Sequence, residues 1–136
     1  MSYDYQFNYI YDLNGEPYPG LVLRISLPHH PEQTLDIDAY FDSGTQRSLL
    51  DGQLGRAMGL DLLSGRPIRY TSVTGSGIDA RLHRIQLSHP DLGNFELEIG
   101  FSIGQISRNL LGRDFFNLIQ IGFREQHLTF YVTPNP

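Results

Sequence analysis

The chain has 136 residues, 40% of them hydrophobic, so it can bury one compact core but is too short for two conventional domains. Its net charge is -5, and its ten basic residues are all arginines without a run or stripe that could follow a phosphate backbone, so we expect no nucleic-acid partner. The apolar stretches are far shorter than the ~20 residues of a membrane helix, no signal-peptide pattern opens the chain, and cysteine is absent. We therefore expect a cytoplasmic protein without a membrane contact, a disulfide or a thiolate metal site.

Glycines and prolines separate short apolar runs throughout the chain, which is typical of a β-rich domain. The first two expected strands, residues 5–11 and 21–27, flank a turn-rich segment at 14–17 and predict an opening hairpin or meander. From Leu35 to Phe41 every second residue is apolar, so the strand that they form should bury one face. Asp42 should then point away from that apolar face.

One helix is expected in the first half of the chain, after Ser48, where apolar residues recur at helical spacing. These residues are Leu50, Leu54, Ala57 and Met58. Gly52 and Gly55 lower its intrinsic helix propensity, so it should be marginal when isolated.

A flexible hairpin is expected further on, where residues 67–73 and 78–87 read as strands joined by the glycine-rich segment 74–77. Such a hairpin could act as a lid. Further strands are expected at 95–101, 109–111, 119–123 and 128–132, and one or two helical turns at 114–118.

Two segments carry a resemblance to a known family. Ala39-Tyr40-Phe41-Asp42-Ser43-Gly44-Thr45-Gln46-Arg47-Ser48-Leu49-Leu50 resembles the active-site segment of retropepsin-like aspartic proteases. About 65 residues later, Asn109-Leu110-Leu111-Gly112-Arg113-Asp114-Phe115-Phe116 resembles the apolar-apolar-Gly strand and short helix of the same family. An Asp-Ser-Gly triplet alone is not specific, but the order and spacing of both elements agree with the family.

The resemblance implies a mainly β fold, the closed-barrel-like half of an acid protease with one or two short helices, which pairs as a twofold dimer. The resemblance covers roughly residues 21–132. We assign residues 21–136 to the protease domain and residues 1–20 to an N-terminal extension or a first hairpin strand. The implied activity is that of an aspartic endopeptidase acting on a polypeptide substrate, with no cofactor and no metal.

The resemblance also assigns roles to residues. Asp42 is the catalytic aspartate, and because the chain has one such triplet, the second carboxylate comes from a second copy of the chain. Ser43, Gly44 and Thr45 support the active-site turn. The flap that covers the substrate comprises Val73, Thr74, Gly75, Ser76, Gly77 and Ile78, and the structural second element comprises Leu110, Leu111, Gly112 and Arg113. We also place Tyr70 at the border of a substrate pocket.

One departure from the retroviral pattern concerns charge. Retroviral members often carry an aspartate soon after the triplet, paired with the arginine of the Gly-Arg element, whereas Gln46 and Arg47 stand here. Arg113 therefore needs another partner, for which a backbone carbonyl is the candidate. Asp114 begins the short helix, where an acid interacts favourably with the positive helix end, and we assign it a structural role.

Other motifs have simpler readings. Side chains of the adjacent His29 and His30 diverge in an extended chain, so they do not suggest a zinc site. The tripeptide His89-Pro90-Asp91 matches the J-domain signature but is flanked by strand-like sequence, so we read it as a turn. Ser43 lacks the Gly-x-Ser-x-Gly elbow of a hydrolase nucleophile.

The segment from Gly75 to Gly77 could also suggest a phosphate-binding loop. It lacks the lysine of such a loop and precedes a strand, so a hairpin tip is the better interpretation.

Two interpretations remain open for the function of the whole chain. The alternative to a protease is a catalytically silent module of the same fold that binds a peptide or dimerises, because fold and function can part company.

Overall fold

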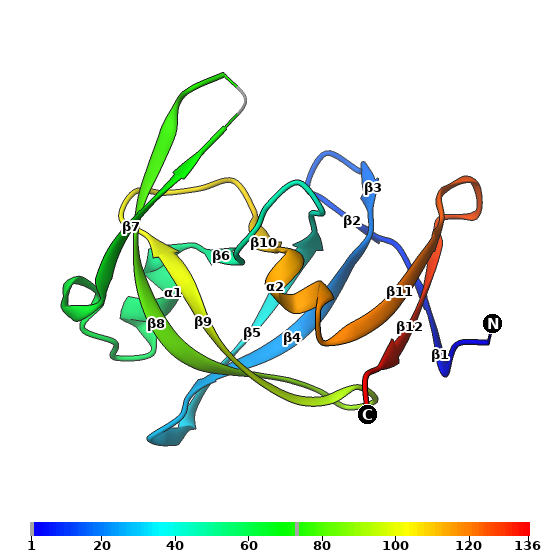
Figure 1. Cartoon of the computed structure of the whole chain (residues 1–136), viewed down its shortest axis with the longest axis horizontal. Coiled ribbons are helices and arrows are strands. Elements are labelled where there is room, and N and C mark those ends of the chain that lie inside the picture. The colour runs from blue at the N-terminus through cyan, green and yellow to red at the C-terminus, as the bar shows by residue number, and fades with distance from the viewer. Residues whose placement is uncertain (1, 73) are drawn as a thin grey trace.

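The computed structural model describes residues 2–72 and 74–136 and is built mainly of β-strands (Figure 1). The strands are β1 (Tyr5–Asn8), β2 (Ile10–Tyr11), β3 (Pro17–Tyr18), β4 (Gly20–Leu27), β5 (His30–Phe41), β6 (Leu49–Leu50), β7 (Arg66–Thr71), β8 (Gly77–His89), β9 (Gly93–Ser102), β10 (Asn109–Leu111), β11 (Ile119–Arg124) and β12 (Thr129–Pro134). The helices are α1 (Gly52–Ala57) and α2 (Arg113–Phe116), with 3-10 turns η1 (Leu62–Ser64) and η2 (Glu125–His127).

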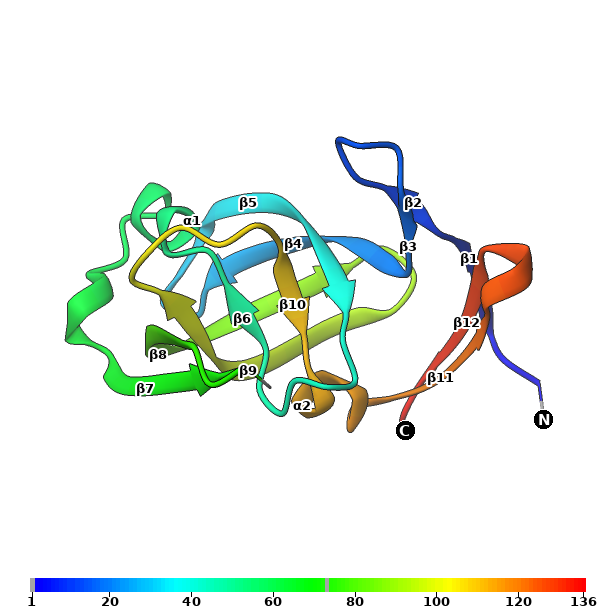
Figure 2. The same ribbon diagram turned by 90° about the horizontal axis from the view of Figure 1, so that it is seen from above.

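The main sheet has seven strands in the order β4-β5-β10-β6-β9-β8-β7, and β4 also pairs with β8. This extra pairing closes six of the strands into a ring around the core, while β7 extends beyond it. Strands β1, β12 and β11 form a separate sheet, and β2 and β3 form a small hairpin. Figure 2 shows the separate sheet at one end of the molecule, beside the β2–β3 hairpin.

The strand that leads to Asp42 has the predicted alternation. Ile37, Ala39 and Phe41 are buried, whereas Asp36 and Asp38 are exposed. Burying apolar side chains on one face is favourable because it removes them from water, and this fixes which face of β5 is turned inward.

The single strand expected over residues 5–11 is divided into two strands, β1 and β2. Tyr9 interrupts it and is buried, with its backbone N–H bonded to the carbonyl of Leu128 at 2.8 Å and its hydroxyl to Glu125 at 3.1 Å. The chain on either side of Tyr9 then takes different partners, β12 for β1 and β3 for β2. The opening hairpin is therefore present but is formed by β2 and β3, whereas β4 pairs with β5 and β8.

The helix expected after Ser48 is shorter than predicted, because Leu50 belongs to β6. Its N-cap is Asp51, whose side chain accepts from the backbone N–H of Gln53. Gly52 and Gly55 are its buried positions. A Cβ at Gly52 would lie 2.0 Å from the carbonyl oxygen of Ser102, so the glycines that weaken the isolated helix allow it to pack closely against β9.

No helix among residues 2–72 and 74–136 is long and apolar enough to cross a membrane.

Candidate active site

The turn that carries Asp42 holds both oxygens of its carboxylate. The backbone N–H of Gly44 donates to Oδ1 at 2.8 Å, and the hydroxyl of Thr45 donates to Oδ2 at 3.2 Å. The backbone N–H of Asp42 itself donates to the carbonyl of Leu111 at 2.9 Å. Asp42 is half-buried, whereas Ser43 and Gly44 are exposed. The Asp42 carboxylate is therefore oriented by donors of its own chain, while the next two residues, Ser43 and Gly44, are exposed.

The predicted second element lies beside this turn. Strand β10 pairs in parallel with β5, which aligns Leu110 with Tyr40 and Leu111 with Phe41, and it pairs antiparallel with β6 (Figure 2). The two segments that carry the family resemblance therefore lie side by side, although the paired residues are 70 positions apart along the chain.

The start of α2 closes over the far end of the turn. The backbone N–H groups of Arg113 and Asp114 donate to the carbonyls of Thr45 at 2.8 Å and Gln46 at 3.1 Å. A Cβ at Gly112 would lie 2.6 Å from the carbonyl oxygen of Thr45. Only a glycine allows these two backbone segments to approach so closely.

Ser48 and Asp114 form a clamp that the sequence did not reveal. The Ser48 hydroxyl donates to Oδ1 of Asp114 at 2.7 Å, and the Ser48 N–H lies 3.0 Å from both carboxylate oxygens. The same hydroxyl accepts the backbone N–H of Gly112 at 2.9 Å. Asp114 also accepts the N–H of Phe115, as expected of an acid in the first turn of a helix. Its structural role thus extends from the helix to the active-site segment.

The two arginines near the turn are differently placed. Arg47 donates to the carbonyl of Glu98 at 3.2 Å and to its carboxylate at 3.3 Å, and Arg66 donates to the same carboxylate at 3.1 Å. Arg113 is exposed, and its side chain makes no hydrogen bond or ion pair within the described part of the chain. Among the described residues, Arg113 therefore does not bond to the backbone carbonyl that we expected as its partner.

The predicted hairpin is formed by β7 and β8, and it projects from the same end of the molecule as the turn between β5 and β6 (Figure 1). Val73 lies outside the described residues. The hydroxyls of Ser72, Thr74 and Ser76 bond to one another at 2.7 to 3.1 Å, and Gly75 has a φ of +85°. The described part of the tip is thus hydrophilic, and Ile78, near the start of β8, is an exposed apolar side chain.

Tyr70 bonds to the segment that follows the candidate catalytic turn. Its hydroxyl donates to the carbonyl of Ser48 at 2.8 Å, and burial raises the pKa of Tyr70 well above its ordinary value. The residue therefore connects the hairpin to the active-site segment.

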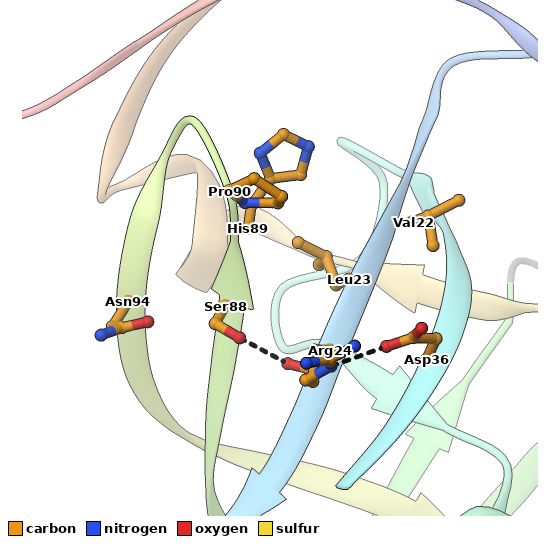
Figure 3. Close-up of a pocket in the computed structure, with 8 residues that line it drawn as sticks. All are labelled: Val22, Leu23, Arg24, Asp36, Ser88, His89, Pro90 and Asn94. Carbon is orange, nitrogen blue, oxygen red and sulfur yellow. Dashed lines mark hydrogen bonds and ion pairs between the residues drawn. The ribbon is translucent and has the colours of Figure 1, made fainter.

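Two hollows in the surface lie apart from Asp42. One, of about 560 Å³, lies between β4 and the β8–β9 turn, where Arg24 pairs with Asp36 at 3.0 Å (Figure 3). His89 lines it, and its Nδ1 accepts the N–H of Asp91 at 3.1 Å, which confirms that this tripeptide forms a turn. The other, of about 540 Å³, lies beside the β2–β3 hairpin and is lined partly by Arg108.

Comparisons with known proteins agree with this architecture. No protein-family model matches the sequence, and the search of curated proteins found no relative. Among solved structures, a retropepsin-like aspartic protease from Rickettsia conorii is similar, with a TM-score of 0.63 and 17% identity over 94% of this chain and 90% of that one. The EIAV protease in complex with the inhibitor HBY-793 has a TM-score of 0.52 and 16% identity, over 79% of this chain and 91% of that one.

These similarities define the class of fold. The protein has a retropepsin-like fold, as the sequence resemblance predicted. The two alignments include most of each matched chain, so the similarity concerns the whole fold and not an isolated motif.

Proposed function

We propose that this protein is an aspartic endopeptidase in which two copies of the chain each supply Asp42 to one active site. The observation that carries the proposal is the orientation of the Asp42 carboxylate by the Gly44 amide and the Thr45 hydroxyl, on a turn whose next two residues are exposed. A catalytic group must be held in position before the substrate arrives, and these two donors provide that restraint.

The second carboxylate would come from the partner. Within the described residues no other acidic side chain bonds to Asp42, so a single chain offers half of the required pair. A twofold interface would place the two turns opposite each other, and Ser43 and Gly44 would face the partner turn. Ser43 can then donate to and accept from the opposing turn, which would keep the two loops rigid.

The reaction follows from two carboxyl groups held close together. They cannot both ionise readily, so the pair shares one proton and presents a base and an acid at the same pH. The ionised carboxylate removes a proton from water as the water oxygen bonds to the peptide carbonyl carbon, and the protonated carboxyl donates its proton to the carbonyl oxygen. The carboxyl that took the proton from water then donates it to the nitrogen as the C–N bond breaks. A hydroxyl of the tetrahedral intermediate returns its proton to the other carboxylate, which yields an acid, an amine and the original carboxyl pair.

The remaining predicted residues would position the substrate and the turn. Residues 73–78, including Val73, would form a flap that closes on the substrate and excludes water. An extended peptide would pair with the flap and cleft through its backbone. Residues 110–113 would support the turn through the contacts of β10 and α2, without touching the substrate.

The test compares the wild type with Asp42→Asn on a peptide library and a denatured protein between acidic and neutral pH. Asp38→Asn is the matched control, because Asp38 is an exposed carboxylate on the same strand. We expect cleavage by the wild type and the control, and none by Asp42→Asn. Equal cleavage by all three proteins would refute the mechanism. If none cleaves but an extended peptide binds, the chain is a silent module of this fold.

A further inference from the structure

Tyr70 joins the hairpin to the segment that follows the candidate catalytic turn. It lies in β7, and its hydroxyl donates to the carbonyl oxygen of Ser48 at 2.8 Å. The same oxygen accepts the backbone N–H of Gly100 at 3.1 Å. One carbonyl of the active-site segment is therefore held at once by the hairpin strand and by β9.

The ring of Tyr70 occupies a space that only a glycine leaves open. A Cβ at Gly100 would lie 2.4 Å from the hydroxyl oxygen of Tyr70 and 2.9 Å from its Cζ atom. Burial raises the pKa of the Tyr70 hydroxyl, so this group is protonated and able to donate at neutral pH. The contact is thus defined by shape as well as by the hydrogen bond.

A second connection runs beside this one but is weaker. Arg66 of β7 and Arg47 of the active-site segment both bind the carboxylate of Glu98. The Arg66 side chain is 67% exposed and that of Glu98 40%. Exposed ion pairs contribute little, because water solvates both charges and the long side chains lose conformational entropy. Tyr70 is therefore the stronger link between hairpin and turn.

The contacts continue from Ser48 to Asp42. The Ser48 hydroxyl accepts the N–H of Gly112 at 2.9 Å, and the preceding residue, Leu111, accepts the N–H of Asp42 at 2.9 Å. A displacement of Ser48 is therefore transmitted over two hydrogen bonds and one peptide unit to the residue that carries the carboxylate. Chains of packed and hydrogen-bonded groups of this kind can carry energetic coupling between two sites.

We propose that Tyr70 is a positioning residue that holds the β7–β8 hairpin in the place from which it covers Asp42. The inference rests on the proposed function, since it assigns the hairpin the role of a flap. Tyr70 does not touch the reacting atoms and acts through Ser48. Without its hydroxyl the hairpin samples more open positions, so a smaller fraction of the protein is competent to bind and the apparent affinity for the peptide falls by the same factor.

The test compares Tyr70→Phe with Tyr9→Phe. Both changes remove one hydrogen-bonded tyrosine hydroxyl, but that of Tyr9 bonds to Glu125, on the β11–β12 side of the molecule. For Tyr70→Phe we expect KM to rise about 10-fold with kcat within about 2-fold of the wild type, and for Tyr9→Phe we expect both constants to stay within about 2-fold. Gly100→Ala, whose methyl group displaces the ring, should reproduce the effect of Tyr70→Phe.

Backbone hydrogen exchange provides a readout that needs no activity. We expect the amides of Ser72 and of residues 74–78 to exchange at least about 5-fold faster in Tyr70→Phe than in the wild type, and Tyr9→Phe to leave them unchanged. Unchanged exchange in Tyr70→Phe, or equal acceleration in both variants, would overturn the inference even if the wild type cleaves peptides. If no peptide is cleaved, the exchange result still decides the role of Tyr70 and the proposed protease activity fails separately.

Discussion

Replacing Ser48 by alanine should destabilise the protein by about 3 kcal/mol, because one buried and one partly buried hydrogen bond are lost together. The Ser48 hydroxyl is fully buried, donates to the Asp114 carboxylate at 2.7 Å and accepts the N–H of Gly112 at 2.9 Å. Ser48→Ala leaves that N–H without an acceptor in a buried site. It also leaves the Asp114 carboxylate with one donor fewer.

The magnitude follows from these two losses. A hydrogen bond to a charged group contributes about 1.5–3 kcal/mol, and an unsatisfied buried N–H costs about 1–3 kcal/mol. The two losses add to about 2.5–6 kcal/mol, and we expect about 3 kcal/mol, in the lower part of that range, because the site can relax partly. With an unfolding entropy of about 2.1 cal/mol/K per residue, a chain of 136 residues should lose about 10 °C in Tm.

Urea denaturation and calorimetry measure this change directly. Ser64→Ala is the control, because its hydroxyl also makes a hydrogen bond, to the carbonyl of Asp61, but at an exposed site. The control should stay within about 0.5 kcal/mol of the wild type. A Ser48→Ala variant that also stays within about 0.5 kcal/mol would show that the clamp does not hold the active-site segment.

Two further predictions concern α1 and the β8–β9 turn. Gly52→Ala should cost about 2 kcal/mol or more in urea denaturation, because its methyl group would overlap the carbonyl of Ser102, whereas Gly104→Ala, which has open space, should be nearly neutral. Burial lowers the pKa of His89, so the folded state disfavours the charged form of this side chain. The protein therefore has its full stability with respect to this group above the ordinary pKa of histidine. It loses stability as the pH falls from there to the pKa of His89 in the folded state. His89→Asn keeps an acceptor without a titrating group, so its stability should fall less than that of the wild type between pH 7.5 and pH 5, and equal falls would contradict the assignment.

The features that were predictable from the sequence depend on local periodicity or on spacing. Alternation from Leu35 to Phe41 identified the inward face of β5 because successive side chains of a strand point to opposite faces. The hairpin tip was predictable because Gly75 and Gly77 are residues that turns favour. The Leu-Leu-Gly element was found through its resemblance to a family, and not from any physical signal within the segment.

The features that were missed depend on contacts between distant segments. Ser48 and Asp114 are 66 residues apart, and nothing local to either residue reveals the other. Strand β1 pairs with β12 at the opposite end of the chain, so the first twenty residues could not be assigned a partner. The expected start of α1 was wrong because Leu50 belongs to β6 and pairs with β9, a contact that helical spacing along the sequence does not reveal.

The central claim is that each active site needs Asp42 from two chains, and mixing experiments test it most directly. Wild type and Asp42→Asn are mixed at a constant total concentration, allowed to exchange subunits, and assayed for peptide cleavage. If one site uses two copies of Asp42, activity should follow the square of the wild-type fraction, so an equal mixture retains about a quarter of full activity. Activity that falls in direct proportion to the wild-type fraction would mean that one chain is sufficient and would contradict the shared site.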